Sequence, residues 1–104
     1  MDTMKGLKRT NYCGETSGVG SVAVVGGYVQ KIRDLGNLIF IDLRDRTGIV
    51  QLAFDDSTDR EIFNKAKSCR SEYVLMAKGT VRERESKNPD MKTGDIEVYV
   101  DDLR

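Results

Sequence analysis

This chain of 104 residues contains no histidine and no tryptophan, one proline and two cysteines. Without histidine, nucleophiles that need a histidine partner, of the Ser–His or Cys–His kind, are excluded. The two cysteines, Cys13 and Cys69, are far apart and lack metal-ligand spacing, which argues against a zinc site. We therefore expect both to be free thiols of a cytoplasmic protein, because reducing compartments leave thiols unpaired.

An excess of charge of either sign is also missing. The 17 Lys and Arg balance the 17 Asp and Glu, which argues against strong sequence-independent DNA binding through many phosphate contacts. No apolar run is long enough to span a membrane, and residues 1–5 lack the apolar segment of a signal peptide. The length predicts one domain with a modest core.

Motifs for catalysis and nucleotide binding are lacking too. The sequence has no phosphate-binding GxxxxGK[ST] or GxGxxG motif, and its Gly18-Val19-Gly20 precedes a predicted strand rather than a helix. The carboxylates fall in predicted turns and on solvated faces, as at Asp42, Asp45, Asp55, Asp56, Asp101 and Asp102. We predict no catalytic residue, cofactor site or metal site in this chain.

Residues 38–54 are the most informative segment, and predict two strands joined by a tight charged turn. Side chains alternate between faces along a strand. The predicted core face carries Ile39, Ile41, Leu43, Val50, Leu52 and Phe54, and the opposite face carries Phe40, Asp42, Arg44, Ile49, Gln51 and Ala53. An aromatic ring among hydrogen-bonding groups on an open sheet is typical of a site for an unpaired base. Alternatively, Phe40 lies under a loop or in a second small core.

The other elements are predicted from the same patterns. Residues 1–20 form an N-terminal arm, and residues 21–33 a strand whose Gly26-Gly27 marks a bulge or sharp coil. A capping box of Thr58 and Glu61 begins a short helix. Its apolar stripe is Ile62, Phe63, Ala66 and Cys69. A strand over 72–85 has Tyr73, Leu75, Ala77, Gly79 and Val81 on one face. A polar loop over 85–94 leads to a strand over 95–100, with Ile96, Val98 and Val100 inward and Asp95, Glu97 and Tyr99 outward.

Three strands, one helix and two strands give the element order of an OB-fold. We predict an all-β, five-stranded Greek-key barrel over residues 21–104, with the helix between the third and fourth strands. An SH3-like barrel or a split sheet could share this count. OB-folds bind oligonucleotides on the face of strands two and three, together with the loops after strands one and four. Basic residues near those loops could contact phosphates or be ordinary surface charge: Lys31, Arg33, Arg44, Arg46, Arg82, Arg84 and Lys87.

A family resemblance covers nearly the whole chain. Its residues include Tyr12-Cys13-Gly14-Glu15, Gly27-Tyr28-Val29-Gln30, the run DLGNLIFIDLRDRTGIVQ over 34–51, Gly79-Thr80-Val81-Arg82 and residues 93–98. Together they resemble the N-terminal anticodon-binding domain of bacterial aspartyl-tRNA synthetase. Tyr28 stands where the family usually has tryptophan.

The resemblance implies a module of a class II aspartate–tRNA ligase that binds the splayed GUC anticodon of tRNA-Asp. By position in the motifs, Phe40 matches the stacking phenylalanine, Gln51 the base-contacting glutamine, Arg33 the arginine at the end of the first strand, and Glu97 the acidic residue of the last strand. The asparagine of the long loop corresponds to Asn88 or Ser86. Arg44, Arg82 and Lys87 complete the expected nucleic-acid-binding set.

The family's large catalytic domain, with its ATP, magnesium and aspartate sites and the expected homodimer contact, is absent from these residues. We therefore expect an excised domain or a freestanding homologue that is non-catalytic alone. Two other functions stay open: a stand-alone protein that binds single-stranded nucleic acid, and a protein-interaction barrel in which Phe40 anchors a partner peptide.

Overall fold

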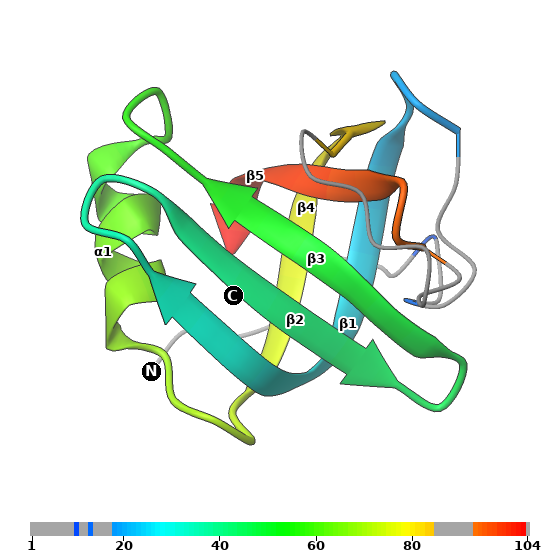
Figure 1. Cartoon of the computed structure of the whole chain (residues 1–104), viewed down its shortest axis with the longest axis horizontal. Helices are drawn as coiled ribbons and strands as arrows, with labels where there is room; N and C mark the ends of the chain where they lie inside the picture. The colour runs from blue at the N-terminus through cyan, green and yellow to red at the C-terminus, as the bar shows by residue number, and fades with distance from the viewer. Residues whose placement is uncertain (1–9, 11–12, 14–17, 85–92, 104) are drawn as a thin grey trace.

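The computed structural model describes residues 10, 13, 18–84 and 93–103. The elements in chain order are β1 (Val22–Asp34), β2 (Ile39–Asp45), β3 (Gly48–Phe54), α1 (Arg60–Ser68), β4 (Val74–Glu83) and β5 (Ile96–Leu103). The strands close into a barrel in the order β1-β2-β3-β5-β4 (Figure 1). Strands β3 and β5 run parallel, and the other neighbouring pairs run antiparallel. This arrangement confirms the predicted OB-fold.

The inner face of the β2–β3 hairpin fills the barrel as the alternation predicted. The side chains of Ile39, Ile41 and Leu43 are fully buried, as are those of Val50, Leu52 and Phe54. Helix α1 lies at one end of the barrel (Figure 1) and adds Phe63 and Ala66 to the core. Burying this apolar surface is the main stabilising contribution to such a fold. The candidate site lies on the opposite face of the hairpin.

Strand β1 pairs with β4 through its first half and with β2 through its second half. The backbones cross closely at Gly27, where a Cβ atom would lie 2.3 Å from the carbonyl oxygen of Arg44. The predicted bulge lies further along, because the β1–β2 register shifts between Val29 and Lys31. A bulge inserts one residue and re-aims the side chains beyond it. Here the inserted residue is Gln30.

The helix cap differs from the predicted one. Asp59 is the N-cap, and its Oδ1 accepts the backbone N–H of Glu61 at 3.0 Å. The hydroxyl of Thr58 instead accepts the backbone N–H of Asp55 at 2.9 Å. Thr58 therefore stabilises the turn after β3. The predicted capping box was wrong, because the N-cap is Asp59, one position after Thr58.

The last two strands also differ at their ends. Strand β4 begins at Val74 rather than at residue 72, because Glu72 has a φ of +71°, which belongs to the left-handed region and not to a strand. Tyr73, predicted to share one face of the strand with Leu75, Ala77, Gly79 and Val81, lies before β4 and is 51% exposed. Strand β5 continues past Val100 to Leu103, which pairs with Ala77 and is buried.

Both cysteines are free and buried. Cys13, placed by the sequence in an N-terminal arm, is part of the core cluster, and its backbone N–H donates to Asp45 Oδ2 at 2.7 Å. Burial opposes ionisation of Asp45, but hydrogen bonds from Thr47 and Cys13 outweigh it and lower the pKa of that carboxyl. Burial raises the pKa of the Cys69 thiol. Among the described residues, no helix is long and apolar enough to cross a membrane.

Candidate nucleic-acid interface

An open groove of about 710 Å³ lies on the outer face of the barrel, where β1, β2, β3, β4 and β5 each contribute side chains. Its lining is Arg33, Leu38, Phe40, Gln51, Asp55, Arg82, Glu83, Arg84 and Glu97. Five of the predicted nucleic-acid-binding residues therefore meet in one place: Arg33, Phe40, Gln51, Arg82 and Glu97.

The Phe40 ring stands on this face in partnership with Arg33. The two residues are cross-strand partners in the β1–β2 register, and the Arg33 guanidinium lies 4.9 Å from the ring centroid. Such an arrangement is attractive because the ring face carries partial negative charge. Phe40 is half-buried rather than enclosed. One face of the ring is thus held by a cation, in a groove open to a ligand.

Gln51 lies on the same face but is only 3% exposed, which corrects the expectation of a freely outward side chain. Its Oε1 accepts from Arg33 Nη2 at 3.0 Å, and its Nε2 donates to Glu97 Oε1 at 2.8 Å. A donor on one side and an acceptor on the other fix which way the amide points. One N–H of the amide and one lone pair of its oxygen remain for a ligand.

Glu97 is tied from both sides. Its second oxygen, Oε2, accepts a hydrogen bond from Arg82 Nε at 2.6 Å, and the two side chains form an ion pair. The Glu97 side chain is only 7% exposed. The parallel pairing of Gln51 with Glu97 in β3 and β5 brings these groups together. In this state Glu97 orients Gln51 and Arg82, so its role here is to position other groups.

A second aromatic residue extends the network. The Arg82 guanidinium lies 4.2 Å from the centroid of the Tyr99 ring, and the Tyr99 hydroxyl donates to Asp55 Oδ1. Burial and this hydrogen bond raise the pKa of Tyr99. Burial opposes ionisation of Asp55, but hydrogen bonds from Tyr99, Ser57 and Thr58 and the charge of Arg82 lower the pKa of its carboxyl.

The groove is nearly neutral, because its lining holds three guanidinium groups and three carboxylates. Affinity from charge alone would therefore be modest, and recognition would depend on the ring and the hydrogen-bonding groups. Within the described residues, no group of three or more His, Cys, Asp or Glu could hold a metal ion.

Other predicted residues are not part of this groove. Arg44 lines a separate groove further along the outer face, and its role stays a prediction. Ser86, Lys87 and Asn88 lie outside the described residues. Sequence reasoning missed Tyr99 and Asp55 as members of the network. The alternation did place Tyr99 outward beside Glu97, but the β3–β5 register that brings it close could not be inferred.

Comparison with known proteins agrees with this architecture. Residues 23–104, most of the chain, match the family described as the OB-fold nucleic acid binding domain. The chain belongs to this family. Like other OB-fold nucleic acid binding domains, it carries its candidate interface on the outer barrel face around β2 and β3.

This OB-fold nucleic acid binding domain is similar to several larger proteins. It is 50% identical over 107 residues to an aspartate–tRNA(Asp/Asn) ligase of Caldanaerobacter subterraneus subsp. tengcongensis, covering 99% of this chain and 18% of that protein. It is 51% identical, with the same coverage, to an aspartate–tRNA ligase of Ruminiclostridium cellulolyticum. The crystal structure of asparaginyl-tRNA synthetase from Pyrococcus horikoshii matches with a TM-score of 0.74 and 30% identity, over 90% of this chain and 22% of that one. The chain thus spans under a fifth of the length of these two ligases.

Replacing Gln51 by alanine is expected to lower stability as well as base discrimination. The change removes the hydrogen bond that Gln51 accepts from Arg33 Nη2 and leaves Oε1 of the buried Glu97 without its donor, while Oε2 keeps Arg82. An unsatisfied buried polar group costs about 1–3 kcal/mol. Chemical denaturation measures the free energy of unfolding. Gln30→Ala is the control, because Gln30 also accepts a hydrogen bond from an arginine, Arg44, but is exposed. A Gln51→Ala protein as stable as Gln30→Ala would show that the network contributes nothing to folding.

Proposed function

We propose that this domain binds the anticodon loop of tRNA-Asp for an aspartate–tRNA ligase. The observation that carries the proposal is the junction of Phe40, Arg33, Gln51 and Glu97 in one groove on the barrel face. The similarity to aspartate–tRNA ligases supports the choice of tRNA. The rest of such a class II ligase would supply ATP and magnesium binding and a homodimer contact through its catalytic domain.

In this proposal, an unstacked base lies on the open face of Phe40 while Arg33 holds the other face. Every base has a flat face, so stacking supplies affinity with little sequence preference. The fixed amide of Gln51 then reads a base edge with its remaining N–H and lone pair. A wrong base leaves those buried groups unpaired, and this penalty gives discrimination.

The test is a titration of the 104-residue chain with the anticodon stem-loop of tRNA-Asp. The controls are the same hairpin with a scrambled loop and hairpins with single-base changes in the anticodon. We expect preferred binding of the aspartate anticodon. Equal binding of the scrambled loop would refute anticodon reading and favour a general binder of single-stranded nucleic acid.

Binding is expected to weaken as salt rises, but modestly. For single strands, log affinity falls with log salt with a slope of about −0.7 for each phosphate neutralised. If arginines of the groove neutralise two or three phosphates of the bound strand, the slope would be about −1.4 to −2. Affinity should then fall roughly 7- to 20-fold between 50 and 200 mM salt. A titration series in NaCl measures this slope, and a slope near zero would exclude phosphate contacts.

A further inference from the structure

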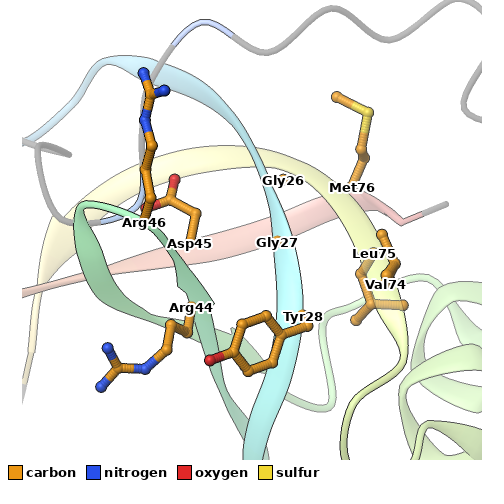
Figure 2. Close-up of a pocket in the computed structure, with 9 residues that line it drawn as sticks. All are labelled: Gly26, Gly27, Tyr28, Arg44, Asp45, Arg46, Val74, Leu75 and Met76. Atoms are coloured by element: carbon orange, nitrogen blue, oxygen red, sulfur yellow. The ribbon is translucent and has the colours of Figure 1, made fainter.

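A second groove, of about 810 Å³, lies further along the outer face (Figure 2). It is lined by Gly26, Gly27, Tyr28, Arg44, Asp45, Arg46, Val74, Leu75 and Met76. None of these residues belongs to the groove around Phe40. Tyr28 is 41% exposed and Val74 is 65% exposed, so this groove presents an aromatic residue to solvent.

The bulge at Gln30 places Tyr28 on the same face as the proposed anticodon site. Tyr28 pairs with Arg44 and Arg33 pairs with Phe40, although five positions separate Tyr28 from Arg33 in the chain. In a regular strand, two side chains five positions apart point to opposite faces. The residue inserted at the bulge brings Tyr28 and Arg33 onto the same face. Strand β2 pairs with β3 without a register shift, so Phe40 and Arg44 share one face. One row of side chains thus joins the two grooves.

The chemistry of the second groove resembles that of the first. Figure 2 shows the Tyr28 ring beside Arg44, with Val74 and Met76 on the neighbouring strand. Gln30 Oε1 accepts from Arg44 Nε and so orients the guanidinium. Asp45 is the acidic residue of the lining, and its two oxygens are occupied by the N–H of Cys13 and by the N–H and hydroxyl of Thr47.

Between the grooves, charges are matched across the strands. Asp42 of β2 lies opposite Lys31 of β1, so the acidic residue between Phe40 and Arg44 faces a basic residue of the neighbouring strand. Phe40 and Arg44 are four positions apart on β2. At a rise of about 3.3 Å per residue, the two ends of the path lie about 13 Å apart. A single OB fold covers roughly 4–16 nucleotides, so one strand could reach both grooves.

We propose that Tyr28 and Arg44 form a second stacking site, which takes an unpaired nucleotide of the same RNA strand that contacts Phe40. This inference rests on the proposed function, since it extends the RNA path from the anticodon site. Tyr28 provides the flat face, Arg44 contacts the phosphate or stacks on the base edge, and Val74 and Met76 form an apolar wall. The β1 bulge is the structural device that brings the ring onto the RNA-binding face.

The test compares single-stranded RNAs of two lengths, the trinucleotide GUC and a ten-nucleotide strand with GUC at its centre. In Tyr28→Leu, the ten-nucleotide strand is expected to bind roughly 5- to 150-fold more weakly, the range found for loss of one base–aromatic stack. Binding of the trinucleotide should be unchanged. Tyr28→Phe keeps the ring and should bind both RNAs like wild type.

Tyr73→Leu is the matched control, because Tyr73 is an exposed tyrosine one residue before Val74 that does not line the groove. A thermal unfolding curve for each variant checks that the barrel is intact. Photo-crosslinking of a ten-nucleotide strand with 5-iodouracil flanking GUC should attach to Tyr28 and not to Tyr73.

Two results separate this inference from the proposed function. If Tyr28→Leu binds the ten-nucleotide strand like wild type while Phe40→Ala binds it weakly, the second site is wrong and the anticodon site stands. If wild type binds neither the anticodon hairpin nor either single strand, the proposed function fails and this inference fails with it.

Discussion

Replacing Phe40 by alanine is expected to weaken binding of the tRNA-Asp anticodon hairpin by roughly 5- to 150-fold, the equivalent of about 1–3 kcal/mol. The alanine side chain offers no flat face to a base. It also removes the ring on which the Arg33 guanidinium lies, so the cation loses its support. Because any base can stack, hairpins with other loop sequences should lose affinity by a similar factor. Fluorescence anisotropy with labelled hairpins measures these ratios.

The Phe40 experiment needs a control for folding and for bulk. Phe40 is half-buried on the outer face and is not a member of the core cluster, so the variant should keep a cooperative unfolding transition. Phe40→Leu retains apolar volume without a ring and should bind almost as weakly as Phe40→Ala. Wild-type affinity in either variant, or loss of the folded barrel, would show that Phe40 is a structural residue.

Replacing Gly79 by alanine is expected to produce the largest loss of stability. A Cβ atom there would lie 2.1 Å from the carbonyl oxygen of Tyr99 and 2.9 Å from the Cα of Val100. Both neighbours are backbone atoms, so β4 and β5 must separate. Overpacking costs about 1–3 kcal/mol and occasionally more, and we expect at least about 3 kcal/mol here. In a domain of this size that lowers the melting temperature by roughly 12–24 °C.

Gly26→Ala is the matched control for Gly79→Ala. Its Cβ would meet the flexible Met76 side chain at 3.4 Å and no backbone atom closer than 3.7 Å. We expect its free energy of unfolding to change by no more than about 1 kcal/mol. Differential scanning calorimetry on both variants decides the point, and equal melting temperatures would mean that β4 and β5 tolerate a methyl group between them.

The fold was largely predictable because its signals are local. Alternation along residues 38–54 predicted the six core side chains of β2 and β3, although Gln51 and Ala53, predicted to face outward, are buried as well. The order of elements predicted the barrel. The predicted helix cap and the predicted start of β4 were wrong, because local interactions there favour another arrangement. Thr58 is bonded to the turn at Asp55 rather than to the helix, and Glu72 adopts a left-handed conformation that delays β4.

For the site, the sequence predicted part of the membership but not the arrangement. The resemblance supplied Arg33, Phe40, Gln51 and Glu97, and the structure brings them into one groove. The burial of Gln51 was not predicted, because it depends on a parallel register between β3 and β5 that no local pattern contains. The bulge was predicted at Gly26-Gly27 but lies at Gln30. This difference changes the face on which Tyr28 lies.

The parallel pairing of β3 with β5 also determines when the site can exist. Gln51 and Glu97 are 46 positions apart in the chain, and such long-range pairings form late because a long loop must close first. A chain emerging from the ribosome would present Phe40 and Gln51 long before Glu97 and Arg82 could orient them. Under the proposed function, reading of a base edge by Gln51 would then begin only once β5 has docked, so an incomplete chain would not discriminate between anticodons.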